Sequence, residues 1–139
     1  MRFSRESRYA LVGLRHLASK PYGTIIGPST LAEEADLPAP FMAKIFHKLA
    51  RDGILTSHRG RVRGYSLARQ AEEITISQVL VAIEGADVFS RCIFVSDTCD
   101  ESNPCLLHDR WAPVVEATAA VFDTTSVAAL DVDLEVGPA

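Results

Sequence analysis

Three cysteines lie close together in the C-terminal half of this 139-residue chain. Cys92, Cys99 and Cys105 are spaced C-x6-C-x5-C, and His108 follows three residues after the last of them. Thiolates and an imidazole within a short polar loop are ligands that iron and zinc accept in proteins. One interpretation of the spacing is therefore a metal or iron–sulfur site built from these four side chains.

Two other interpretations of the cysteines stay open at this point. They could be redox-active thiols, or they could be inert, because cysteine often serves as a small buried apolar residue. A structural disulfide would leave one thiol unpaired, and the sequence shows no sign of secretion. Zinc sites usually contain paired C-x2–4-C motifs, which this chain lacks.

Charge is divided unevenly along the chain. Residues 1–69 carry 12 basic and 5 acidic side chains, whereas residues 70–139 carry 2 and 13. A basic half joined to an acidic half indicates that only the first half faces a polyanion such as DNA. The N-terminal segment MRFSRESRYALVGLRHLA contains charges throughout and looks like neither a signal peptide nor a membrane span. We therefore expect a globular cytoplasmic protein.

The basic half has the pattern of a helix-turn-helix. Apolar residues recur at helical spacing over 4–19, and Thr30 with Glu33 fits a capping box at the start of a short helix that ends near Asp36. Pro40 suits the first turn of the next helix, and Gly53 suits its end. The outer face of this last helix is basic, which favours DNA contact.

A predicted β-hairpin follows the last of these helices. Residues 54–57 and 65–67 are strand-like, and the tip between them contains two glycines and three arginines. A helix-turn-helix followed by a basic hairpin is the winged-helix arrangement. We therefore predict a mainly α fold with a small β-hairpin, in which DNA is contacted by Lys44, His47, Lys48, Arg59, Arg61 and Arg63.

The second half should place the cysteines between two helices. Thr75 and Gln78 form a capping box for a helix that Gly85 ends. Because an interior proline disfavours an unbroken helix, Pro113 predicts that the last helix starts near Ala112. Its apolar residues predict a homodimer. The expected regions are a DNA-binding winged helix at 1–70, a connecting helix at 71–91, a cysteine loop at 92–111, a dimerisation helix at 112–130 and a mobile acidic tail at 131–139.

Taken in order, these motifs resemble the Rrf-type winged-helix transcriptional regulators. The resemblance rests on RYALVGLRHLA, LAEEADLPAPFMAKIFHKLARDGIL, RGRVRGYSLA, ITISQVLVAIEG and the three spaced cysteines. It extends from Met1 to about Leu130. It implies a homodimer that binds promoter DNA and carries an iron–sulfur cluster whose state changes the affinity for DNA.

The resemblance also implies a ligand set. Cys92, Cys99 and Cys105 match the three thiolates of the family, and His108 matches the histidine ligand of its IscR branch. The NsrR branch uses an acidic residue from the first helix of the other subunit, but Arg8 stands at that position here. Glu6 and Asp109 remain alternative fourth ligands. A 2Fe–2S cluster is favoured over a 4Fe–4S cluster.

The sequence thus predicts a regulator of transcription whose binding to a palindromic promoter depends on an iron–sulfur cluster. Redox state, nitric oxide and iron supply are all compatible signals. A cofactor-free thiol-switch repressor and a zinc-stabilised transcription factor are the alternatives. An enzyme is not expected, because the chain shows no Gly-rich phosphate loop and no nucleophile elbow.

Overall fold

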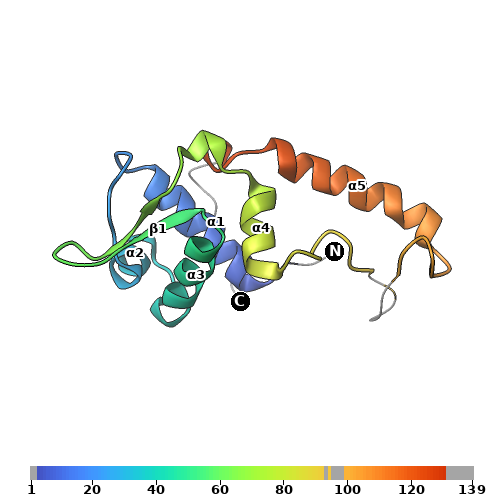
Figure 1. Ribbon diagram of the computed structural model, residues 1–139, viewed down its shortest axis with the longest axis horizontal. Coiled ribbons are helices and arrows are strands. Elements are labelled where there is room, and N and C mark those ends of the chain that lie inside the picture. Colours follow the sequence, from blue (N-terminus) through green and yellow to red (C-terminus); the bar gives the residue numbers. More distant parts are fainter. Residues whose placement is uncertain (1–2, 93, 95–98, 131–139) are drawn as a thin grey trace.

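The computed structural model describes residues 3–92, 94 and 99–130 (Figure 1). Helices dominate, and one two-stranded antiparallel sheet stands beside them, as the sequence predicts. Residues 93 and 95–98 of the predicted cysteine loop lie outside the described residues, and so does the tail predicted at 131–139. In Figure 1, α5 reaches away from the winged helix, and the cysteine loop lies at its far end.

Helix α1 (Arg5–Ala18) begins where the sequence predicts. The Ser4 hydroxyl accepts a hydrogen bond of 3.3 Å from the Ser7 backbone N–H and so caps the first turn. Leu14 and Leu17 are almost fully buried on the inner face of the helix. Helix α1 therefore forms one wall of the core.

Helix α2 (Pro28–Ala35) starts three residues earlier than the capping box with Thr30 as N-cap predicts, so that prediction is wrong. Gly27 is the N-cap, and Pro28 opens the helix. Proline has the backbone φ that a first turn needs and gives up an N–H that would have no partner there. Asp36 adopts a left-handed conformation with a φ of 54° and ends the helix.

Helix α3 (Ala39–Arg51) confirms the second helix of the helix-turn-helix. Pro40 lies in its first turn, and Gly53 follows its end with a φ of 77°. The predicted apolar stripe is fully buried and consists of Met42, Ile45, Phe46 and Leu49. The opposite, polar side of α3 faces solvent.

Strands β1 (Leu55–His58) and β2 (Gly64–Leu67) form the predicted wing, with Leu55 opposite Leu67. Ile26 extends this sheet because it exchanges two backbone hydrogen bonds with Tyr65, of 2.9 and 2.8 Å. Gly64 has a φ of 140°, and a Cβ there would lie 2.5 Å from the Ile26 carbonyl oxygen. Only glycine fits where the wing crosses this segment.

Helix α4 (Ile76–Glu84) has the predicted capping box, since Thr75 and Gln78 bond each other's backbone N–H, and it ends at Gly85. A short 3-10 helix, η1 (Ala71–Glu73), precedes it. Another, η2 (Val127–Ala129), follows α5 and places Val127 in the core.

Helix α5 (His108–Thr124) starts one turn before the predicted Ala112, so the predicted start of the dimerisation helix was wrong. The Trp111 N–H donates to the Leu107 carbonyl over 2.9 Å and closes a first turn before Pro113 is reached. The proline removes only the hydrogen bond to the Asp109 carbonyl, which lies near the exposed end of the helix. The cysteine loop therefore ends at Leu107, and His108 belongs to a helix.

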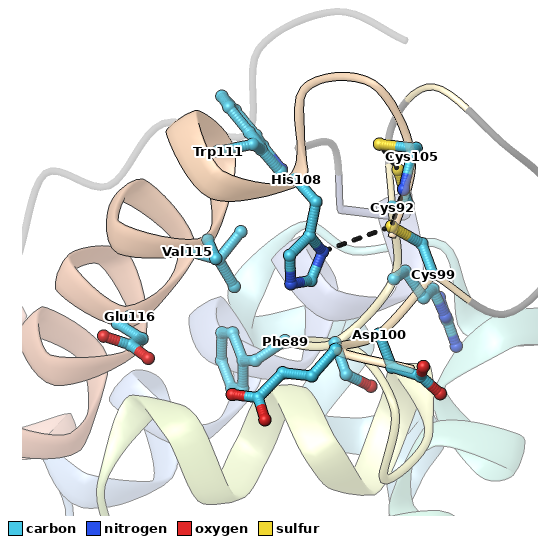
Figure 2. Close-up of a pocket in the computed structure, with 13 residues that line it drawn as sticks. Phe89, Cys92, Cys99, Asp100, Cys105, His108, Trp111, Val115 and Glu116 are labelled. Carbon is cyan, nitrogen blue, oxygen red and sulfur yellow. Dashed lines mark hydrogen bonds between the residues drawn. The ribbon is translucent and has the colours of Figure 1, made fainter. Parts of the chain in front are cut away.

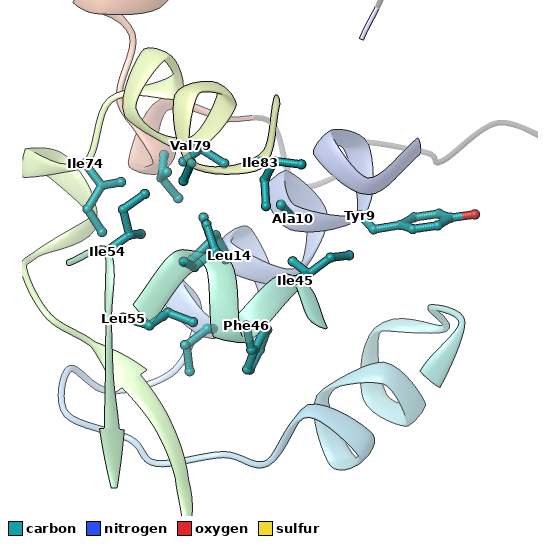
Figure 3. Packing of buried hydrophobic residues seen from close by; sticks show 14 of the residues in the cluster. Tyr9, Ala10, Leu14, Ile45, Phe46, Ile54, Leu55, Ile74, Val79 and Ile83 are labelled. Atoms are coloured by element: carbon teal, nitrogen blue, oxygen red, sulfur yellow. The ribbon is translucent and has the colours of Figure 1, made fainter. Parts of the chain in front are cut away.

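The hydrophobic core lies between α1, α3, α4 and the base of the wing (Figure 3). Phe46, Ile54, Ile74 and Val79 are each at most 1% exposed. By contrast, α5 has no buried residue and exposes Val114 and Val121. The winged helix, α4 and η2 thus share one core, whereas α5 leaves apolar side chains uncovered in the single chain.

Candidate metal centre and DNA-binding surface

The three cysteines converge although they lie on different segments. Cys92 follows the end of α4, Cys99 and Cys105 lie in the loop, and His108 is the first residue of α5. The three Sγ atoms all lie within 4.8 Å of one another, and each cysteine is half-buried. Figure 2 shows the thiols on one side of a cavity and the His108 ring turned toward them.

The four donor atoms form two close pairs. Cys92 Sγ lies 3.6 Å from Cys105 Sγ, and Cys99 Sγ lies 3.3 Å from His108 Nδ1. Two ligands on one tetrahedral metal with bonds of about 2.3 Å lie about 3.8 Å apart, so the thiol pair has the spacing of ligands that share an ion. Because α5 starts at His108, its imidazole sits in this group instead of on a free loop.

Backbone groups also point at the sulfurs. The Phe94 N–H donates to Cys92 Sγ over 3.4 Å, and the Cys105 N–H donates to Cys99 Sγ over 3.3 Å. The bond from Cys105 favours the Cys99 thiolate, but desolvation and the neighbouring thiols outweigh it and raise the pKa of Cys99. A cation held by the same sulfurs would reverse this balance, because coordination deprotonates a thiol.

The cavity beside the sulfurs has a volume of about 290 Å³. Phe89, Trp111 and Val115 form its apolar wall. The indole Nε1 of Trp111 is buried and is the only such side-chain nitrogen or oxygen without a hydrogen-bond partner in the described part of the chain. A buried indole N–H usually has an acceptor. Three converging thiols and an imidazole beside this cavity are donors that iron–sulfur clusters accept, so the residues present fit such a cluster.

Asp100 organises the loop between the second and third cysteines, a role that the sequence analysis missed. Its carboxylate accepts hydrogen bonds from the N–H of Ser102 at 2.8 Å and of Asn103 at 2.9 Å, and from the Ser102 hydroxyl at 2.6 Å. These bonds, first of all that of the hydroxyl, lower the pKa of Asp100. The run Asp-Glu-Ser-Asn is a typical Asx-turn sequence and could have revealed the contact.

The predicted cations of α3 are not all equally free. Glu6 of α1 binds both lysines, with Lys48 Nζ at 2.8 Å and Lys44 Nζ at 3.2 Å. The side chain of Lys48 is only 21% exposed, whereas that of Lys44 is 63% exposed. His47 lies exposed on the same helix. Glu6, one of the alternative fourth ligands, is thus engaged by two lysines of its own chain.

The wing arginines are placed as the sequence predicts. Arg59, Arg61 and Arg63 are all exposed on the tip between β1 and β2. None of them forms an ion pair with any residue that the structure describes. Their guanidinium groups are therefore available to phosphates.

The chain resembles known proteins over almost its whole length. Residues 3–132 match the Rrf2 family, described as iron-dependent transcriptional regulators. The chain belongs to the Rrf2 family. A candidate HTH-type transcriptional regulator of Aquifex aeolicus is 30% identical over 129 residues, which cover 91% of this chain and 89% of that protein. This Rrf2 protein is thus a DNA-binding transcriptional regulator and not an enzyme, as the sequence predicts.

Solved structures confirm the winged-helix fold of this Rrf2 protein. The oxidized form of CymR from Staphylococcus aureus matches with a TM-score of 0.70 at 27% identity, covering 96% of this chain and 97% of that chain. IscR from T. potens matches with a TM-score of 0.69 at 20% identity, covering 93% and 85%. Among the described residues, no helix has the length and apolar character needed to cross a lipid bilayer.

Proposed function

We propose that this Rrf2 protein regulates transcription through an iron–sulfur cluster held by Cys92, Cys99, Cys105 and His108. The observation that carries the proposal is the convergence of three Sγ atoms within 4.8 Å, with His108 Nδ1 beside Cys99. The match to a family described as iron-dependent supports the same cofactor. With only three cysteines in the chain, a histidine is the natural fourth ligand.

The bound cluster would supply a redox-active and chemically labile centre whose state can change with oxidants, nitric oxide or iron supply. The chain's own residues do the rest. The cysteines and His108 would connect the end of α4 to the start of α5, and Trp111 lines the cavity beside them. The favoured cluster is 2Fe–2S, because two donor pairs suit two metal ions.

DNA binding would use α3 and the wing of two chains. His47 and the two lysines of α3 would enter the groove, while Arg59, Arg61 and Arg63 would contact phosphates. The apolar face of α5, with Val114 46% and Val121 59% exposed, would bring two chains together. A symmetric pair of winged helices would read a palindromic site in promoter DNA, since half-sites mirror the symmetry of the protein.

Control of DNA binding requires that the loaded and cluster-free forms differ in their affinity for the promoter. The decisive experiment is purification without oxygen, followed by visible absorption, EPR, and analysis of iron and acid-labile sulfide. A gel shift with a promoter fragment is then run on the same protein with and without the cluster. Iron and sulfide in the protein and a changed affinity are expected. A colourless protein without sulfide would overturn the proposal.

A thiol switch is the second candidate. The 3.6 Å between Cys92 Sγ and Cys105 Sγ favours it, because a modest approach of the two sulfurs would give a disulfide. In that case the metal-free protein would respond to oxidant by losing two thiols and changing its DNA affinity. A zinc-stabilised factor would instead contain zinc and no sulfide. Elemental analysis with thiol titration separates the three cases.

A further inference from the structure

One carboxylate of α1 holds both lysines of the helix proposed to enter the DNA groove. Glu6 Oε2 lies 2.8 Å from Lys48 Nζ, and Glu6 Oε1 lies 3.2 Å from Lys44 Nζ. The hydrogen bond from Lys48, the largest influence, lowers the pKa of Glu6, so the carboxylate is charged at neutral pH. A phosphate that approaches either lysine must therefore compete with Glu6.

The start of α1, which carries Glu6, is tied to the end of α4. Glu84 Oε1 accepts a hydrogen bond of 2.6 Å from the Ser4 backbone N–H and one of 2.7 Å from the Ser7 hydroxyl. Ser7 is 1% exposed, and the side chain of Glu84 is 11% exposed. The bond from Ser7 is partly buried and that from Ser4 is exposed, and together they hold the first turn of α1 against the end of α4.

The end of α4 is in turn tied to the root of the cysteine loop. The Arg91 guanidinium donates to the Glu84 backbone carbonyl and to Asp87 Oδ1, the latter over 2.9 Å. Its Nη1 also lies 3.9 Å from Glu84 Oε2. Arg91 directly precedes Cys92, so the first cysteine follows directly on a residue that contacts Glu84.

An aromatic cluster joins the same two parts of the chain. Phe89, which lines the cavity, packs against Phe3 with ring centroids 6.5 Å apart, and both rings contact Phe122 of α5 at 6.0 and 5.7 Å. Phe3 directly precedes Ser4. The segment that leads into the cysteine loop therefore contacts the start of α1 through both apolar and polar groups.

From these contacts we propose that Glu6 limits DNA affinity by competing with phosphates for Lys44 and Lys48, and that Arg91 and Glu84 connect its position to the cysteine loop. The inference rests on the proposed function for the identity of the DNA-contacting lysines and of the sensing loop. It assigns to Glu6 a role distinct from ligation. The state of the loop acts on DNA affinity by shifting the first turn of α1 and, with it, the carboxylate.

The first test is Glu6→Gln in the full-length protein, with promoter binding measured by fluorescence anisotropy at several salt concentrations. We expect binding about threefold tighter, since an exposed ion pair is worth about that factor. The dependence of log K on log salt should steepen by about one unit for each lysine released to a phosphate. Glu72→Gln is the control, because Glu72 is exposed, loses the same charge and makes no ion pair with a described residue. Equal behaviour of the two variants would overturn the competition.

The second test addresses the connection to the loop. Arg91→Gln and Ser7→Ala each remove one contact of the Glu84 carboxylate, one from the residue before Cys92 and one from α1. In both, the ratio of DNA affinities between cluster-loaded and cluster-free protein should fall toward one while iron and sulfide contents stay at the wild-type level. Variants that bind the cluster and keep the wild-type ratio would overturn the connection. A wild-type protein without cluster would instead count against the proposed function and leave the Glu6 result standing.

Discussion

His108 Nδ1 lies 3.3 Å from Cys99 Sγ, although the two residues are nine positions apart in the sequence. The contact exists because α5 begins at His108, so the first helical turn aims the imidazole at the thiol. The proximity of these two side chains predicts that both are ligands of the proposed metal centre.

His108→Ala should lose most of the iron and sulfide after anaerobic reconstitution, because removal of a ligand leaves only three thiolates. His47→Ala is the matched control, since His47 is an exposed histidine on α3. It should keep its iron and bind the promoter more weakly. Iron and sulfide analysis together with gel shifts would show whether the two effects separate. A loaded His108→Ala protein would point to another fourth ligand, such as Asp109.

Arg61→Ala should weaken binding to all DNA sequences alike and flatten the salt dependence by about one unit, as expected when one phosphate contact is lost. Arg61 is exposed at the tip of the wing. Arg110→Ala removes an exposed arginine from α5 and should change neither quantity. The measurement is a salt titration of binding to specific and to random DNA. An unchanged slope for Arg61→Ala would remove the wing tip from the contact surface.

Val121→Asp should convert the proposed dimer to monomer, because burial of a carboxylate without a partner in an apolar interface is strongly unfavourable. Val62→Asp is a closely matched control, since Val62 is 60% exposed and Val121 is 59% exposed. Only Val121 lies on α5. Analytical ultracentrifugation at several protein concentrations measures the shift. If both variants sediment like the unchanged protein, the interface lies elsewhere.

Glu84→Gln should reduce the loss of stability in acid. Burial alone would raise the pKa of Glu84, but hydrogen bonds from Ser4 and Ser7 outweigh it, and the pKa lies below its usual value of 4.5. A depressed pKa in the folded state stabilises the protein above the unfolded pKa, and this contribution is lost as the pH falls through the folded pKa. The free energy of unfolding, measured with denaturant from pH 7 down to below pH 4.5, should therefore fall less steeply for the variant than for the unchanged protein. If the free energy of unfolding falls equally with pH in both proteins, Glu84 does not contribute to the loss of stability in acid.

Gly64→Ala should destabilise the protein by about 1–3 kcal/mol, because backbone strain is joined by a clash with Ile26. Gly60 also has a positive φ, of 108°, but no atom lies within 4 Å of a Cβ placed there. Gly60→Ala therefore reports the backbone strain alone. Thermal unfolding of the two variants would give the difference. Equal melting temperatures would show that the Ile26 segment yields to the added methyl group.

Most elements that local sequence signals define could be predicted, although the capping-box pattern at Thr30 misplaces the start of α2, and those set by distant contacts could not. The capping box at Thr75 and the glycines of the wing act within a few residues, so pattern and turn chemistry reveal them. The sequence places the start of α5 too late because a proline disfavours a helix interior, whereas the first turn of α5 closes before Pro113 is reached. Glu6 binds Lys44 and Lys48, which lie 38 and 42 positions further along the chain, and no periodicity of the sequence indicates contacts over such distances.

The ligand set shows the same division. Spacing alone suggested that Cys92, Cys99 and Cys105 could share an ion, and the structure brings their sulfurs within 4.8 Å of one another. The orphaned N–H of Trp111 depends on how α5 packs over the loop, so the sequence carried no sign of it. Whether these side chains bind iron stays a prediction.

Helix α5 has no buried residue of its own, whereas the winged helix has a closed core. If the proposed dimer covers α5, the stability of this helix rises with protein concentration, while the core of the winged helix does not depend on a second copy. Under that proposal, the amount of protein in the cell would influence the response as well as the chemical signal.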